Sequence, residues 1–140
     1  MKFKVVLTVM LSVVMLLSCS LPFAAALPEV VEPMYNNTIY TSTSFRLQSS
    51  NSAVVTATYE GVNGITTGAS ITVKVQRLVG SMWADVLGAT WTDTVSGYSG
   101  TVFHSVTLSE AGEYRAIVTY TVRGTGGSPD VITETEELTY

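Results

Sequence analysis

Few side chains in this 140-residue chain have the chemistry that catalysis needs. His104 is the single histidine, so a catalytic triad or a histidine-bearing metal site would have to include it. It lies in a strand-like alternation with Val102 and Val106, which favours a structural or solvated role for its ring. Serines are numerous, but none lies in the strand, elbow and helix pattern of a nucleophilic serine. We therefore expect no catalysis around His104.

Carboxylates offer two further possibilities. Asp85 and Asp93 lie on neighbouring predicted strands and are conceivable as the acid pair of a glycosidase, although simple exposure explains them better. Calcium prefers several oxygen ligands, and such ligands gather near the end of the chain, at Asp130, Glu134, Glu136 and Glu137. No liganding loop pattern accompanies them, and charge on an edge strand discourages aggregation. The prediction is a protein that is not an enzyme and has no metal or cofactor.

Aromatic residues are the remaining candidates for binding. Trp91 has polar neighbours, and Tyr98 lies in a glycine-flanked turn, so we expect both rings to remain outside the core. Exposed aromatic rings on a β-sandwich can stack on sugars or contact a protein partner. Trp83, by contrast, is expected to belong to the core. Trp91 and Tyr98 are therefore the predicted, weak binding residues.

The N-terminus has the order of a secretory signal peptide. Lys2 and Lys4 precede an apolar run over residues 5–17, and three alanines follow at residues 24–26. The run has 13 residues, which is short of the roughly 20 that cross a membrane. Cleavage after Ala26 would leave residues 27–37 as an extended leader and residues 38–140 as one domain. We expect a secreted or cell-surface protein without a membrane span in its mature chain.

Cys19 allows an alternative anchor. The segment Leu16-Leu17-Ser18-Cys19 resembles the lipobox of bacterial lipoproteins, in which the cysteine carries the lipid. Leu17 stands where a smaller residue is more usual, and the residues after Cys19 are apolar rather than a polar tether. An incidental cysteine in a signal peptide is favoured, with lipidation at Cys19 as the alternative.

The charge of the mature part limits its partners. From residue 27 onward there are five basic and eleven acidic residues, a net charge of −6. This sign argues against nucleic acid and against anionic lipid surfaces as partners. Since Cys19 is the single cysteine, the mature domain has no disulfide and depends on its core.

Apolar residues after position 37 recur with period two, which predicts strands. Thr, Val and Ile make up 39 of the 114 residues from position 27 onward, a composition typical of strands. About eight strands are expected, at residues 38–47, 52–60, 69–78, 82–87, 88–95, 101–108, 112–122 and 131–140. Turn signals every eight to twelve residues favour an antiparallel β-sandwich of about 7–8 strands or a small barrel.

The segment LSEAGEYRAIVTYTV at residues 108–122 resembles the tyrosine corner of immunoglobulin-like sandwiches. Leu108 would end a core strand, Gly112 would supply the bend, and the Tyr114 hydroxyl would bond back to the backbone. An inward tyrosine of an ordinary hairpin is the other interpretation. Ala116 occupies the position of the second antibody cysteine, so the resemblance is to disulfide-free immunoglobulin-like or fibronectin type III-like modules.

A wider resemblance covers most of the mature chain. The segments VKVQRLVGSMWADV and GEYRAIVTYTV are similar to an uncharacterised group of small secreted immunoglobulin-like proteins of Gram-positive bacteria. The shared features here are Gln76, Gly80-Ser81, Trp83 and Gly112-Glu113-Tyr114-Arg115. The resemblance implies a fold and carries no catalytic residue. Taken together, these features predict an exported, non-enzymatic binding or structural module at or outside the bacterial envelope, with an unknown protein or a cell-surface glycan as partner. A carbohydrate-binding module is the alternative, and an exported hydrolase is a distant third.

Overall fold

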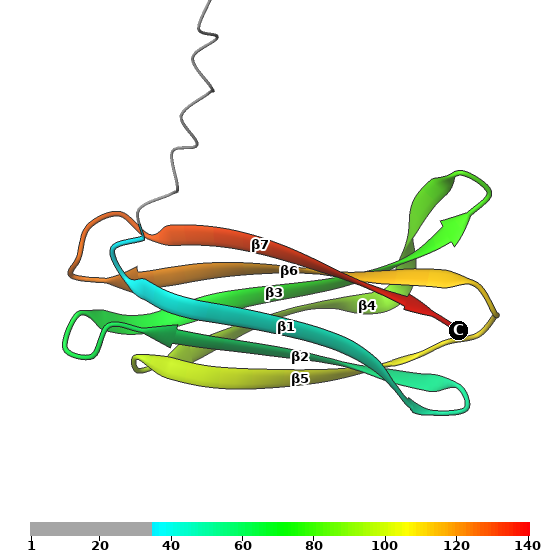
Figure 1. The fold of residues 1–140 in the computed structure, drawn as a ribbon, viewed down its shortest axis with the longest axis horizontal. Helices are drawn as coiled ribbons and strands as arrows, with labels where there is room; N and C mark the ends of the chain where they lie inside the picture. Colours follow the sequence, from blue (N-terminus) through cyan, green and yellow to red (C-terminus); the bar gives the residue numbers. More distant parts are fainter. Residues whose placement is uncertain (1–34) are drawn as a thin grey trace, which may run out of the picture. The chain divides into compact units, whose positions relative to one another are not determined.

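A computed structural model describes residues 35–140 of the chain, so the predicted signal peptide, Cys19 and most of the leader lie outside the described residues. The alternation of inward and outward side chains produces seven strands in this part and no helix (Figure 1). They are β1 (Thr38–Ser49), β2 (Ser52–Gly61), β3 (Thr66–Val79), β4 (Met82–Ser96), β5 (Ser99–Thr107), β6 (Glu113–Gly124) and β7 (Asp130–Thr139).

The strands form two antiparallel sheets. One has the order β1-β2-β5, and the other has the order β4-β3-β6-β7. Their inner faces pack on each other, and the outer faces carry polar side chains. The predicted all-β class and the antiparallel sandwich are confirmed. One detail differs, because the strands expected at residues 82–87 and 88–95 are a single strand, β4.

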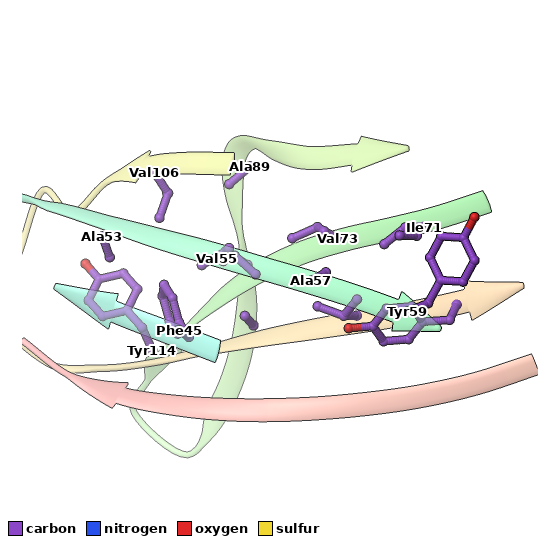
Figure 2. Close-up of a cluster of buried hydrophobic side chains, with 14 of the residues drawn as sticks. Phe45, Ala53, Val55, Ala57, Tyr59, Ile71, Val73, Ala89, Val106 and Tyr114 are labelled. Carbon is purple, nitrogen blue, oxygen red and sulfur yellow. The ribbon is translucent and has the colours of Figure 1, made fainter. Parts of the chain in front are cut away.

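The core contains the inward residues of β2, β3 and β6 almost without exception. These three strands show strict alternation of buried and partly exposed positions. Tyr59 and Tyr114 lie towards opposite ends of the cluster of side chains in Figure 2. Both rings are almost fully buried. The period-two prediction is confirmed for Ala53, Val55, Ala57, Tyr59, Ile71, Val73, Val75, Tyr114, Ala116, Val118, Tyr120 and Val122.

Strand β1 departs from the predicted pattern. Phe45 is buried as expected, but Ile39 is 65% exposed and Leu47 is 47% exposed. The pairing of β1 with β2 shifts register beside both residues. Because a register shift ends regular alternation, the apolar face of β1 reaches the core only near its middle.

A wide bulge divides β4. Lys74 pairs with Thr90 and Gln76 pairs with Asp85, so residues 86–89 of β4 stand opposite Val75 alone. Gly88 has a φ of 74°, a conformation that L side chains rarely adopt. Leu87 is fully exposed within the bulge, whereas Ala89 is buried. Four residues against one is a surplus of three, so the two halves of β4 present opposite parities to the same sheet face.

The contacts of the sandwich begin slightly before residue 38, the predicted start of the domain. Asn37 is fully buried, and its main-chain N–H donates to Asp130 Oδ2 at 2.7 Å. The Asn36 N–H donates to the other carboxylate oxygen at 3.2 Å. The last two residues of the expected leader are therefore held against the start of β7.

Candidate binding site on the outer face of the four-stranded sheet

A network of polar side chains crosses the outer face of β4, β3 and β6. Gln76 stands between two partners, because its Nε2 donates to Asp85 Oδ1 at 2.6 Å and its Oε1 accepts from Arg115 Nε at 2.8 Å. Lys74 Nζ lies 3.3 Å from Asp85 Oδ2. The hydrogen bonds from Gln76 and Lys74 hold the pKa of Asp85 below its usual value, so this carboxylate stays charged in mildly acidic solution.

Trp83 completes this network. The guanidinium carbon of Arg115 lies 4.4 Å from the centroid of the Trp83 ring, within the range of a cation–π contact. Trp83 pairs with Leu78 on β3, which lies two residues beyond Gln76. The side chains of Trp83, Gln76 and Arg115 therefore share one face of the sheet. The prediction that Trp83 belongs to the core is wrong, because its ring packs on Arg115 at the surface and is absent from the buried cluster. We call Gln76, Trp83, Asp85 and Arg115 the outer-face network.

Hydroxyl side chains cover the sheet beside the outer-face network. In one register row, Thr92, Thr72, Thr119 and Thr133 lie on the four successive strands. Thr72 and Thr92 are hydrogen-bonded at 3.0 Å, and Thr119 and Thr133 at 3.2 Å. Alternation with the buried inner positions places all four on the outer face. Beyond the pair Lys74 and Ile117, the outer face therefore continues into a polar row of threonines.

Trp91 lies in a different environment from the predicted one. Its ring packs against the core and stacks on His104 of β5, with ring centroids 4.6 Å apart and planes 8° apart. Asp93 Oδ2 lies 2.5 Å from His104 Nε2. The expectation that Trp91 remains outside the core is wrong, because the bulge turns this half of β4 inward. The three residues join the edge strands β4 and β5 of the two sheets.

Sequence reasoning had identified His104 and Asp93 separately but not as a pair. Their contact depends on the approach of strands from different sheets, which alternation does not report. Within residues 35–140, no hydroxyl group is hydrogen-bonded to the other nitrogen of His104, as a serine triad would require. The structural or solvated role expected for His104 stays a prediction.

Asp85 and Asp93 lie on one strand and on opposite faces of its sheet. Asp85 pairs with Gln76 on the outer face, and Asp93 pairs with the fully buried Ile71 on the inner face. Two carboxylates that flank one glycosidic bond must face the same space. This pair does not meet that condition.

Tyr98 is 44% exposed in the turn between β4 and β5, as expected. Its carbonyl oxygen accepts a hydrogen bond from Gly61 N–H at 2.6 Å, which ties the turn to the end of β2. Tyr98 and Trp91 therefore differ in environment, one at a solvent-facing turn and one against the core. Phe103, which the sequence did not single out, is 66% exposed on β5.

The segment before β6 has the hydrogen bond of a tyrosine corner. The Tyr114 hydroxyl donates to the carbonyl oxygen of Glu110 at 2.7 Å, and Leu108 is buried. Gly112 has a φ of 147°. Arg77 covers this bend, since its Nη1 lies 2.5 Å from Glu110 Oε2 and its Nη2 donates to the Ala111 carbonyl at 3.3 Å. The corner is thus connected to β3 as well.

Two of the acidic residues near the C-terminus, Asp130 and Glu134, are hydrogen-bonded within the fold. Burial raises the pKa of Asp130, but hydrogen bonds from Asn37, Asn36 and Thr38 lower it by more, so the pKa is depressed overall. The Thr41 hydroxyl donates to Glu134 at 2.5 Å. Within residues 35–140, no group of three His, Cys, Asp or Glu side chains is placed to hold a metal ion. The same residues contain no helix that is long and apolar enough to cross a membrane.

Comparisons with known proteins give distant structural similarity alone. No family model matches the chain, and no curated protein sequence matches it. Wild-type OgpA from Akkermansia muciniphila is similar over 78% of this chain at 11% identity, with a TM-score of 0.46. Inactive OgpA in complex with an O-glycopeptide has a TM-score of 0.40 at 12% identity over 79% of this chain. This chain spans 30% and 33% of those two OgpA chains.

A protein from Archaeoglobus fulgidus is similar over 74% of this chain and 97% of its own, at 14% identity and a TM-score of 0.33. No functional residue is carried over from any of these proteins.

Proposed function

We propose that this chain is an exported, non-enzymatic binding module that acts at or outside a bacterial cell envelope. Its contact surface is the outer face of the sheet β4-β3-β6-β7. The observation that carries the proposal is the outer-face network, in which Trp83 and Gln76 hold the half-buried guanidinium of Arg115 on the outer face of the sheet. Tryptophan and arginine are the residues that most often dominate binding energy.

The network contributes little to folding, which supports a role in binding. The ion pair between Asp85 of the network and its neighbour Lys74 has side chains that are 56% and 40% exposed, and exposed pairs add roughly 0–1 kcal/mol to stability. None of its side chains belongs to the buried cluster. A set of aligned side chains that the core does not need is best explained by a ligand.

A second candidate surface lies at the turn between β4 and β5. Tyr98 is exposed there, and an exposed aromatic ring can stack on a sugar. This surface corresponds to the carbohydrate-binding alternative with Trp91 and Tyr98. It is weaker, because the Trp91 ring is already stacked on His104.

Binding to immobilised glycans and cell-wall fragments tests the two surfaces against each other. Trp83→Ala disrupts the outer-face network, and Tyr98→Ala disrupts the turn. Phe103→Ala is the matched control, because Phe103 is an exposed aromatic residue on the other sheet. We expect Trp83→Ala to weaken binding by about tenfold or more, as loss of a hot-spot residue does. Tyr98→Ala and Phe103→Ala should bind as the unaltered protein does.

Loss of binding in Tyr98→Ala alone would move the site to the turn. Equal binding by all three variants would contradict both surfaces. Each variant is first compared with the unaltered protein in thermal denaturation, so that loss of binding is not confused with loss of fold.

A further inference from the structure

Arg115 has a free pair of donors. Its Nε is bonded to Gln76, and its plane is stacked on Trp83. Within residues 35–140, neither terminal nitrogen of Arg115 makes a hydrogen bond or an ion pair. Glu137 is its register partner on β7, yet no ion pair joins them. The guanidinium is therefore held at one edge and one face, and its two-nitrogen end is open.

An arginine in this state is suited to a carboxylate. The two terminal N–H groups match the two oxygens of a carboxylate in a planar, bidentate contact. Holding the side chain in advance lowers the entropy lost on binding. The other positive charge on this face, Lys74, is paired with Asp85, so Arg115 is the group left to receive a carboxylate.

The surroundings favour a saccharide over a peptide. Beyond Lys74 and Ile117, the outer face carries the threonine row, whose hydroxyls can donate to and accept from sugar hydroxyls. Protein interfaces have a buried centre enriched in aromatic residues and methionine. The exposed apolar residues near the outer-face network, Val79, Met82 and Leu87, lie at the β3–β4 turn and in the bulge, and they do not extend over the threonine row.

We infer that the outer-face network binds an acidic saccharide, with a sugar carboxylate held end-on by the terminal nitrogens of Arg115. This inference rests on the proposed function and adds its ligand class. The neighbouring hydroxyls of the saccharide lie over the threonine rows. Trp83 and Gln76 act as positioning residues, because they hold Arg115 and need not touch the ligand.

A titration with defined saccharides tests the ligand class. The probes are a galacturonate hexamer, its methyl ester and a hexamer of glutamate, each added to the intact protein in isothermal calorimetry. The ester keeps the sugar and removes the charge. The peptide keeps the charge and removes the sugar. We expect the galacturonate hexamer to bind, and each of the other two to bind about tenfold more weakly or not at all.

Two arginine variants test the residue. Arg115→Lys keeps the positive charge and removes the two-nitrogen end, so it should weaken galacturonate binding by about tenfold or more. Arg123→Lys is the matched control, because Arg123 lies on the same strand and the same face and is exposed. It should change binding by less than about twofold. Glu137→Gln should strengthen binding, since it removes a negative charge beside the site.

Several results would overturn the inference. They are absence of galacturonate binding, equal binding of the ester, equal binding of the glutamate peptide, and equal weakening by Arg115→Lys and Arg123→Lys. Binding of neutral glycans that depends on Trp83 would overturn the carboxylate assignment and leave the proposed function intact. Unchanged binding in Trp83→Ala would instead count against the proposed function itself.

Discussion

The two tryptophans of β4 are eight residues apart and have opposite roles. Trp83 lies on the outer face beside Arg115, and Trp91 lies against the core beside His104. Each is accompanied by an aspartate two residues later, Asp85 in the first case and Asp93 in the second. In an uninterrupted strand an even spacing would place both rings on one face. The bulge at residues 86–89 reverses the parity and so separates a surface site from an inter-sheet contact.

This difference shows that one local irregularity can divide similar sequence patterns between folding and recognition. Trp-x-Asp occurs twice, at residues 83–85 and 91–93. The inner copy joins two sheets by stacking. The outer copy aligns a half-buried arginine at the surface.

The largest expected effect separates the tryptophans by stability. Trp91→Ala should lower the free energy of unfolding by about 2–3 kcal/mol, because it removes a half-buried ring and its stacking contact with His104. Trp83→Ala should lower it by less than about 1 kcal/mol, the size of an exposed cation–π contact. Urea denaturation of the two variants measures this. Similar losses in both would show that the two environments are not distinct.

A comparison of carboxylates extends the contrast to acid pH. Asp85 and Asp130 both have depressed pKa values, but Asp130 is buried with its main-chain donors. A depressed folded-state pKa stabilises the fold above the unfolded-state value of about 3.9, and this stability is lost as pH falls through the folded value. Asp130→Asn should therefore cost about 2 kcal/mol at neutral pH and progressively less below about pH 4.

Denaturation midpoints measured from about pH 2 to about pH 7, a range that spans the titration of carboxylates, measure the Asp130 effect. Glu136→Gln is the control on the same strand. Asp85→Asn should leave the stability profile close to that of the unaltered protein, since its carboxylate is exposed. A parallel offset at all pH values for Asp130→Asn would show that the charge of Asp130 is unimportant.

A substitution at Gly88 tests the contribution of the bulge to stability. Gly88→Ala should destabilise the fold by about 1–2 kcal/mol, because an L residue is strained at this positive φ. The space around an added Cβ is open, so no steric clash adds to this cost. Gly64→Ala is a matched control, with a φ of 82° and equally open space outside β4. Both should lose similar stability, but Gly88→Ala alone should change the fluorescence of the tryptophans. An unchanged emission spectrum would mean that the bulge geometry does not depend on Gly88.

The smallest expected effect concerns the tyrosine corner at the start of β6. Tyr114→Phe removes the hydrogen bond to Glu110 and should cost roughly 0.5–1.5 kcal/mol. Tyr98→Phe, at an exposed turn, should cost nothing measurable. Coincident denaturant midpoints for Tyr114→Phe and the unaltered protein would show that the hydroxyl does not support the fold.

Much of the fold follows from the sequence because β2, β6 and the part of β3 from Ala69 to Val75 alternate without interruption. The inward positions of Ile71, Val73 and Val75 are determined by period two alone, and the Gly-x-Tyr at residues 112–114 locates the corner. Alternation fails where the register shifts, as at Ile39, Leu47 and the bulge of β4. Gly88 was interpreted as a boundary between strands, although its positive φ serves a bulge within one strand.

The candidate site was less predictable than the fold. Gln76, Trp83 and Arg115 belong to the segments that resemble small secreted proteins, but their contact depends on the pairing of β3 with both β4 and β6. The roles expected for the two tryptophans were exchanged, because hydropathy around a residue does not report the parity imposed by a bulge. The stacking of Trp91 on His104 depends on the approach of two sheets, which has no local signal.

The most direct test of the account is a proton NMR map of contacts from the two indole rings. The account predicts nuclear Overhauser contacts from Trp91 to the His104 ring, and from Trp83 to the Arg115 side chain. Contacts from Trp83 to the buried Val75 or Tyr114, or the absence of contacts between Trp91 and His104, would contradict it.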